Sequence, residues 1–297
     1  MKKILFPTDF SEPANNAFVY ALQLAEKLNA SITTLHIFSH PEIHIERGGI
    51  HPEALQHIYE SIDMDEFENY KDSIPALRSI AEKEKLNHIE LYHIMEDGSV
   101  IPKIIQKAKE GSYDLIVMGT KGAGWVKEVF LGTITGEVME RAGCPVLAVP
   151  KEAKFDGKIN KIAVATEFKK EEIFHLQKVI ELADAFEAHV YCLNVDIAGI
   201  QFYEKQKAEF TTHFKDTPRL HFKTIEGFDI MTALNDYLEK YRMDLLSMVI
   251  HKRNFIQEFF KFSMAKTMSY HAKTPILTFQ SKALKKDESI AQKEGLA

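Results

Sequence analysis

Two copies of one unit make up most of this sequence, and this repeat constrains the fold more than any other feature. Residues 4–35 match residues 162–193 without a gap, at an offset of 158. Residues 114–147 match residues 244–277 at an offset of 130. The fall from 158 to 130 means that the first copy carries 28 extra residues in its middle. Two long ungapped registers indicate a true repeat, so each copy should be one structural unit.

Apolar runs and helix-like stretches alternate along each copy. In the first copy we expect strands over 3–7, 32–37, 88–95, 113–118 and 145–149, and helices over 12–28, 52–87, 100–109 and 129–141. Ser11 followed by Pro13 suits the start of the first helix, because a hydroxyl caps the helix and proline fits its first turn. Short apolar strands separated by helices are typical of a parallel sheet covered on both faces.

The predicted fold class is therefore α/β, with two tandem, doubly wound, parallel five-stranded sheet domains. The first domain should span residues 1–150 and the second residues 159–280. Between them, residues 151–158 are polar and suit a linker. The last segment, 281–297, is rich in charge and is expected to be disordered.

Charge and hydropathy exclude several classes of function. With 37 basic and 43 acidic residues, the net charge of -6 gives no general attraction to nucleic acid or to anionic membrane. No apolar stretch approaches the roughly 20 residues that span a bilayer, and the first residues turn polar too soon for a secretory signal. Cys144 and Cys192 lie in apolar runs, as core cysteines do. We therefore expect a cytoplasmic protein with neither a nucleic-acid nor a membrane partner.

A glycine-rich loop after the fourth predicted strand is the strongest candidate for a functional site. Glycine follows the strand at 119 and recurs at 122 and 124, and Gly132-Thr133-Ile134-Thr135 comes next. Glycines let the backbone approach a ligand, and successive N–H groups can bind an anion. Both threonines lie near the start of a helix, whose N-terminus favours negative charge. The first strand ends at Pro7-Thr8-Asp9. The Asp9 carboxylate could accept a hydrogen bond from a ribose hydroxyl or a base amino group.

The glycine spacing matches neither a Walker loop nor the dinucleotide-binding fingerprint. The pattern G-x2-G-x9-G-[ST], here Gly119, Gly122, Gly132 and Thr133, instead resembles that of the universal stress protein family. The flanking segments 7–11 and 144–149 and the tandem repeat strengthen the resemblance, which covers both copies. It implies an adenine-nucleotide alpha-hydrolase-like, Rossmann-like fold.

The resemblance also implies a nucleotide site in the first copy, for ATP with Mg²⁺ as an additional component. In ATP-binding members, the strand-one aspartate and the backbone after strand two hold adenosine, and the glycine loop and its hydroxyls hold ribose and phosphates. The implied nucleotide-binding residues are Pro7, Thr8, Asp9, Ile37, Phe38, Met118, Gly119, Thr120, Lys121, Gly122, Gly132, Thr133, Ile134 and Thr135. By position, Lys121 and Lys127 could add charge near the phosphates. The alternative is that the glycines only make turns.

The second copy departs from this pattern. Val249, Lys252 and Phe262 stand at the glycine positions, and Ser263 alone keeps the hydroxyl of Thr133. Glu167 replaces Asp9, and its longer side chain would crowd the same space. A basic turn at 251–253 could still hold an anion, although a solvated turn is the simpler interpretation. We therefore predict that the second copy binds no ATP in the family manner.

The function that follows is an ATP-binding universal stress protein with a regulatory or stress-response role, in which only the first domain holds nucleotide. Alternatives are an interaction module whose loop is empty, or a slow ATPase or autophosphorylating protein with Thr133 or Thr135 as acceptor. An adenylylating enzyme would need a signature after strand one that Pro7-Thr8-Asp9 lacks. No catalytic residue is assigned.

Partners and other ligands follow from weaker patterns. An unknown regulatory protein is one expected partner. The last strands of the copies, 146–149 and 276–279, have apolar edges that need pairing, in a homodimer or an intramolecular pseudo-dimer. The apolar region 255–268 suits packing against the first domain, with a pocket for an apolar ligand or a partner-docking surface as the alternative.

Metal binding is not expected. The insertion of the first copy contains possible ligands, which are His40, His44, Glu46, His51 and His57. Their spacing matches no compact ligand motif, and the segment suits a loop leading into a helix.

Overall fold

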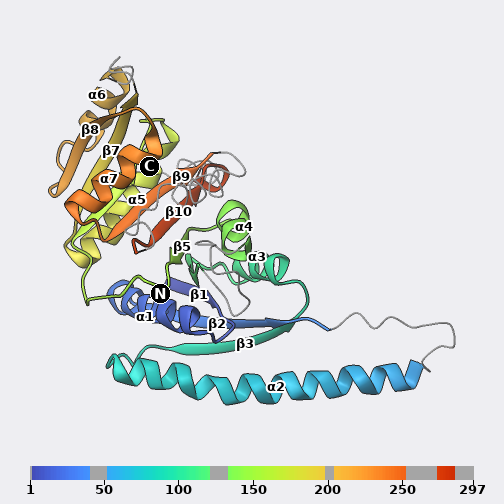
Figure 1. Cartoon of the computed structure of the whole chain (residues 1–297). Coiled ribbons are helices and arrows are strands. Elements are labelled where there is room, and N and C mark those ends of the chain that lie inside the picture. Colours follow the sequence, from blue (N-terminus) through green and yellow to red (C-terminus); the bar gives the residue numbers. More distant parts are fainter. Residues whose placement is uncertain (1, 41–51, 121–132, 198–203, 252–272, 285–297) are drawn as a thin grey trace.

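The computed structural model describes residues 2–40, 52–120, 133–197, 204–251 and 273–284 (Figure 1). The elements of the first copy are β1 (Lys2–Pro7), α1 (Glu12–Leu28), β2 (Ala30–Phe38), α2 (Pro52–Lys83), β3 (Leu91–Asp97), α3 (Val100–Glu110), β4 (Leu115–Gly119), α4 (Thr133–Arg141) and β5 (Val146–Val149). Those of the second copy are β6 (Lys161–Ala165), α5 (Glu171–Phe186), β7 (His189–Ile197), α6 (Glu204–His213), β8 (Leu220–Gly227), α7 (Ile230–Tyr241), β9 (Leu245–Ile250) and β10 (Ile276–Gln280).

Each copy is a doubly wound parallel sheet, as the repeat predicts. The strand order is β3-β2-β1-β4-β5 in the first copy and β8-β7-β6-β9-β10 in the second. Within each copy, every pair of neighbouring strands is parallel. The order reverses at β1 and at β6, which places a topological switch point beside the carboxyl end of the first strand of each copy.

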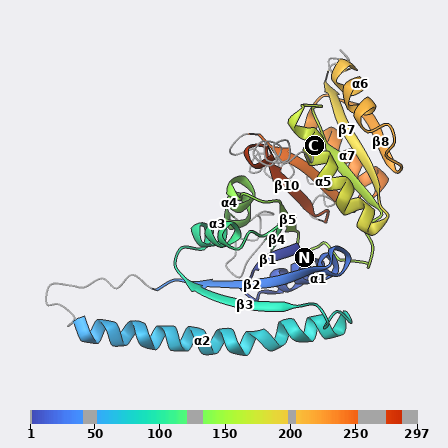
Figure 2. The same ribbon diagram turned by 180° about the vertical axis from the view of Figure 1, so that it is seen from behind.

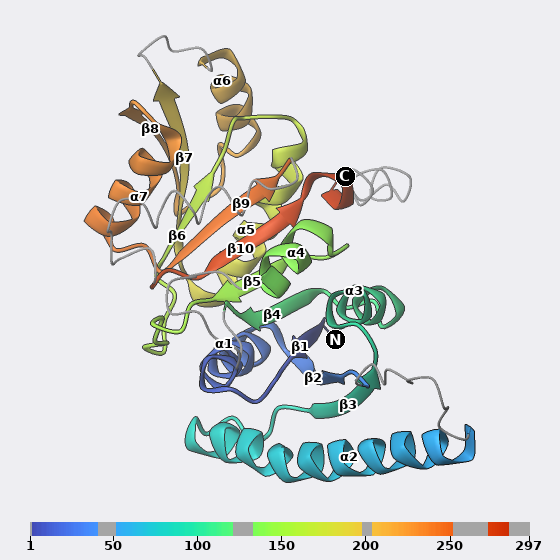
Figure 3. The same cartoon turned by 45° about the vertical axis from the view of Figure 1, so that its right-hand side comes forward.

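The two sheets join into one ten-stranded sheet through β5 and β10 (Figure 3). These strands pair antiparallel, with Leu147 opposite Leu277. The expected pairing of the last strands is therefore present inside one chain. The two predicted five-stranded sheets thus form one continuous sheet, because each last strand offers unpaired backbone groups that the other copy satisfies.

The helices cover both faces of this sheet (Figure 2). Buried residues of α1, α2, α5 and α6 share one core with the strand residues that face them, among them Phe6 and Leu277. Buried residues of α3, α4 and α7 share the other core, to which Leu5 and Ile276 belong. Successive strand residues thus alternate between two apolar layers, which explains why the strands are apolar throughout.

Two expected boundaries differ from the structure. The third strand begins at Leu91 rather than at 88, because Ile89 N–H donates to the Leu86 carbonyl (3.1 Å) in a turn. The charged C-terminal segment starts with a helical turn over 281–284, in which Leu284 is buried. The prediction of disorder is therefore wrong for these four residues. The rest of that segment lies outside the described residues.

The extra length of the first copy lies between its second and third strands. There, α2 has 32 residues, whereas α6 in the second copy has 10. Figures 1 and 2 show α2 running alongside β3 at the outer edge of the sheet. Among the described helices, none combines the length and the apolar character that crossing a membrane requires.

Candidate functional site

The turn after β1 presents the carboxylate of Asp9 at the carboxyl edge of the sheet. Pro7 ends the strand and is buried, as is Thr8, whose N–H donates to the Leu35 carbonyl (2.9 Å). Thr8 Oγ1 accepts from Phe10 N–H (3.0 Å), and Asp9 Oδ1 accepts from Ser11 N–H (3.1 Å). The Asp9 side chain remains exposed. The turn is therefore held by its own side chains, while the Asp9 carboxylate faces solvent.

The end of β2 lies beside this turn. His36 Nδ1 contacts the Thr8 carbonyl at 3.0 Å. Ile37 and Phe38 belong to β2 itself and are half-buried, and the Phe38 carbonyl accepts from Gly98 N–H (2.9 Å). The structure thus brings Asp9 and the Ile37–Phe38 backbone to the same edge of the sheet.

An aromatic cluster that the sequence interpretation missed supports this turn. The His36 ring stacks on Tyr70 of α2 (centroids 5.7 Å apart, planes 16° apart), and Phe10 packs against both rings. Burial raises the pKa of the Tyr70 hydroxyl. Burial and then the charge of Arg78 lower the pKa of the neighbouring His93, whose Nδ1 contacts Thr34 Oγ1 at 2.8 Å. Only the fold shows this cluster, since α2 comes from the insertion.

Gly119 ends β4 in close contact with the start of α1. A Cβ at this position would lie 3.1 Å from the Pro13 carbonyl oxygen and 3.4 Å from Ala14 N. A side chain here would therefore require the start of α1 to move by a few tenths of an ångström, so glycine fits best, independently of any ligand. Met118 before it and Thr120 after it are buried, and Thr120 N–H donates to the Val149 carbonyl (2.9 Å). The strand end is thus rigidly placed between α1 and β5.

The start of α4 meets the same strand end. Thr135 is buried, and its hydroxyl donates to the Gly119 carbonyl (2.8 Å), whereas Thr133 and Ile134 are exposed in the first turn. The Thr135 hydroxyl therefore ties α4 to β4, and Thr133 is the hydroxyl that remains accessible. The N-terminal ends of α1 and α4 thus both lie at Gly119, where their dipoles favour an anion. Lys121, Gly122, Lys127 and Gly132 lie outside the described residues.

In the second copy, a buried glutamate occupies the corresponding turn. At the offset of 158, Glu172 stands where the first copy has Ala14. Its Oε2 accepts from Thr166 Oγ1 (2.8 Å), Glu167 N–H (3.0 Å) and Lys169 N–H (3.1 Å). Its Oε1 lies 3.3 Å from His251 Nε2. A carboxylate of the chain itself thus binds the backbone donors of this turn.

Glu167, which should crowd the second site according to the sequence, instead extends outward. Its side chain is about half exposed and pairs with Lys169. Val249 at the Gly119 position is buried in β9, as expected for a filled strand end. The exchange of Ala14 for Glu172 could have been read from the repeat alignment, because a small residue becomes charged there. Lys252, the apolar region 255–268, Phe262 and Ser263 lie outside the described residues.

Two of the possible metal ligands in the insertion are described. His40 lies between two carboxylates, with Nε2 2.8 Å from Asp63 Oδ1 and Nδ1 3.1 Å from Asp97 Oδ1. His57 lies 3.5 Å from Glu60 within α2. No group of three or more such side chains among the described residues could hold a metal ion. His44, Glu46 and His51 are not among them.

Comparison with known proteins agrees with this architecture. The sequence model of the universal stress protein family matches residues 1–150. Universal stress protein MJ0531 of Methanocaldococcus jannaschii is 27% identical over 154 residues, which is 52% of this chain and 84% of that protein.

Two solved structures also align with this chain, over different shares of its length. A universal stress protein from Archaeoglobus fulgidus has the same fold over 94% of this chain and 96% of its own, with a TM-score of 0.67 and 17% identity. A family protein of Arabidopsis thaliana with AMP bound aligns with 50% of this chain and 90% of its own, at a TM-score of 0.32 and 17% identity. Because the family model covers half of the sequence, this chain belongs to the universal stress protein family.

Proposed function

We propose that the first domain binds one adenine nucleotide, and that the second domain binds none. ATP with Mg²⁺ is the ligand to test first, and AMP is a second probe because the Arabidopsis relative holds it. Nucleotide occupancy would serve a regulatory or stress-response role by changing the shape or the partners of the protein.

The observation that carries the proposal is the convergence of three elements at one strand end. Gly119 lies against the start of α1, and the Thr135 hydroxyl fixes the start of α4 to its carbonyl. The exposed Thr133 hydroxyl and Asp9 carboxylate belong to the same edge of the sheet. An anion there would meet two helix N-termini, and Asp9 offers an acceptor to ribose or adenine.

The contrast with the second copy supports restricting the site to the first domain. There, Glu172 already accepts from the hydroxyl and the N–H groups of the turn after β6. A phosphate would have to approach a buried carboxylate, and like charges repel strongly where water is excluded. Val249 also adds a side chain where the first copy has none.

Calorimetric titration of two matched variants tests the proposal. Asp9→Ala should weaken ATP binding about tenfold, the effect of one lost charge-assisted hydrogen bond. Glu167→Ala changes the equivalent residue of the second copy and should leave the affinity unchanged. Thr133→Val should also weaken binding, because it removes a hydroxyl at the helix start.

Three outcomes separate the alternatives. No heat of binding at millimolar ATP would favour an interaction module whose loop only makes turns. Loss of binding in Glu167→Ala but not in Asp9→Ala would place the site in the second copy and contradict the proposal. Release of phosphate that stops in Thr133→Val would favour the slow ATPase or autophosphorylating alternative.

A further inference from the structure

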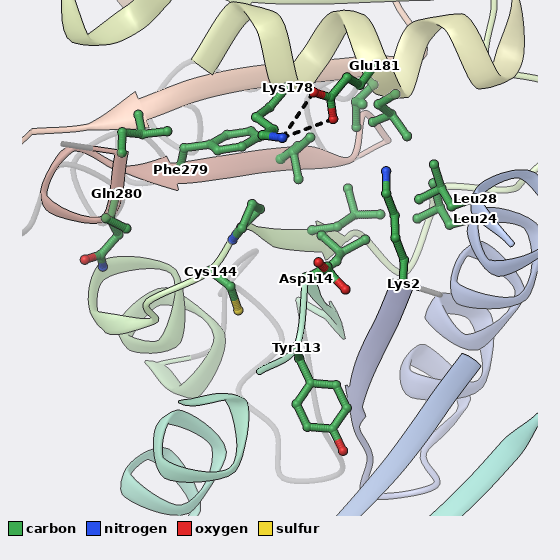
Figure 4. A pocket seen from close by; sticks show the side chains of 18 of the residues that line it. Lys2, Leu24, Leu28, Tyr113, Asp114, Cys144, Lys178, Glu181, Phe279 and Gln280 are labelled. Atoms are coloured by element: carbon green, nitrogen blue, oxygen red, sulfur yellow. Dashed lines mark hydrogen bonds and ion pairs between the residues drawn. The ribbon is translucent and has the colours of Figure 1, made fainter. Parts of the chain in front are cut away.

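A cavity of about 490 Å³ lies at the junction of the two copies, away from the candidate nucleotide site (Figure 4). It opens at the amino ends of β1 and β4, where Lys2 and Leu115 line it, whereas the nucleotide site lies at their carboxyl ends. Helix α1 forms one wall and helix α5 the other, and β10 passes between them. Neither copy alone contains this cavity.

The walls of the cavity are mainly aliphatic and aromatic. Side chains of α1, α5 and the paired strands contribute most of the surface, among them Leu24, Leu28, Leu147, Phe174, Leu182 and Phe279. Close-packed interiors do not retain voids of this size, since unfilled apolar walls lose both dispersion contacts and burial. Pockets for small molecules are typically about 300–1,000 Å³, mostly apolar, and frequent at domain interfaces. The size and the lining are therefore those of a ligand site.

Charged groups line the same cavity, and all but one are already paired. The Asp114 carboxylate accepts from Lys3 N–H (2.8 Å), and the Asp244 carboxylate accepts from Lys161 N–H (2.9 Å). Lys178 pairs with Glu181 at 3.1 Å.

Lys2 is the exception among these groups. Its side chain extends from the start of β1 toward α5 in Figure 4. Within the described part of the chain, no carboxylate lies at ion-pair distance from its ammonium group. One cation at the mouth of an apolar cavity suits a ligand with a long hydrocarbon body and one anionic end.

We propose that this cavity binds a long-chain aliphatic carboxylic acid. The hydrocarbon chain lies between α1 and α5 against Leu147 and Phe279, and the carboxylate lies at Lys2. Because both domains supply walls, the acid bridges the pseudo-dimer and stabilises the junction that β5 and β10 form. This site is independent of the nucleotide proposal, since it shares no residue with it.

Displacement of a fluorescent fatty acid from the full-length protein tests this site. A dansyl-labelled undecanoic acid, used below its micellar concentration, should bind with one site per chain, and hexadecanoic acid should displace it. Leu28→Trp, on the wall of α1, should fill the cavity and abolish binding of both acids. Leu182→Trp, on the wall of α5, should do the same, so that the result does not depend on one variant folding.

Two controls define the head group and the location. Lys2→Gln should weaken the binding of hexadecanoic acid about threefold to fivefold, the effect of losing an exposed ion pair. Hexadecanol should bind equally to wild type and variant. Lys3→Gln changes the adjacent lysine, whose Nζ donates to the Gly111 carbonyl (3.3 Å), and should leave both affinities unchanged. Saturating ATP should not displace the probe.

The proposal is overturned if wild-type protein binds no probe, or if both tryptophan variants fold and still bind it. Displacement by ATP would place the acid in the nucleotide site and would equally contradict it. If Lys2→Gln weakened the binding of the acid and of the alcohol equally, Lys2 would not bind the carboxylate, and the proposed ligand class would be wrong.

Discussion

At the scale of single residues, the buried side chains of α5 distinguish the second copy from the first. Glu172 accepts three hydrogen bonds from the turn after β6, so its removal would leave buried donors unsatisfied. Glu172→Ala should lower the free energy of unfolding by about 2–3 kcal/mol, whereas Glu167→Ala, at an exposed ion pair, should change it by less than about 0.5 kcal/mol. Urea unfolding at one pH measures both, and equal losses would contradict the structural role of Glu172.

His175, on the same helix, gives the stability of the protein a dependence on pH. It is fully buried against Ser247 (2.8 Å), and burial, with a smaller effect of the charge of His251, lowers its pKa to about 3. An unfolded histidine titrates near 6.5, so only the unfolded state gains this proton as pH falls from 6.5 toward 3. The contribution is therefore complete above pH 6.5 and should be reduced by about 2 kcal/mol at pH 5.

A variant isolates this effect from other titrating groups. In His175→Gln, the difference between the unfolding free energies at pH 7.5 and pH 5 should shrink by about 2 kcal/mol. Denaturant titrations at the two pH values give this difference for both proteins. An unchanged difference would mean that His175 accepts its proton without unfolding.

At the scale of elements, α3 and α7 are equivalent helices with unequal caps. Asp229 caps α7 by accepting from Met231 N–H and Thr232 N–H, both at 3.1 Å, while Ser99 at the same place in α3 makes no side-chain cap bond. Asp229→Ala should cost about 1 kcal/mol of stability, and Ser99→Ala less than half of that. Chemical denaturation compares the two variants, and a larger loss for Ser99→Ala would refute this assignment of the caps.

The elements themselves could largely be predicted from the sequence, because each strand is an apolar run between helices with clear starts, such as the one at Ser11. The pairing of β5 with β10 was also accessible, since both strands have apolar edges. The role of Glu172 was not predicted, because Glu167, and not Glu172, is the residue that aligns with Asp9. The stacking of Tyr70 on His36 could not be foreseen, since it depends on how the inserted α2 docks.

At the scale of the whole molecule, one chain builds what resembles a dimer of two unequal halves. The continuous ten-stranded sheet fixes the halves through β5 and β10 and leaves β3 and β8 at its edges. The junction cavity depends on side chains from both copies, so no pattern within either copy could have indicated it. The two halves are asymmetric among the described residues, because Gly119 ends β4 in the first copy, whereas the buried Val249 stands at the equivalent position of β9 and Glu172 binds the turn after β6.

Equilibrium dialysis of the full-length protein with radiolabelled ATP and Mg²⁺ tests this asymmetry most directly, because it counts the nucleotides bound per chain at saturation. We expect one ATP per chain, and none in Gly122→Lys, which places the lysine of the second copy in the loop of the first. Two nucleotides per chain, or one that persists in Gly122→Lys, would contradict the account.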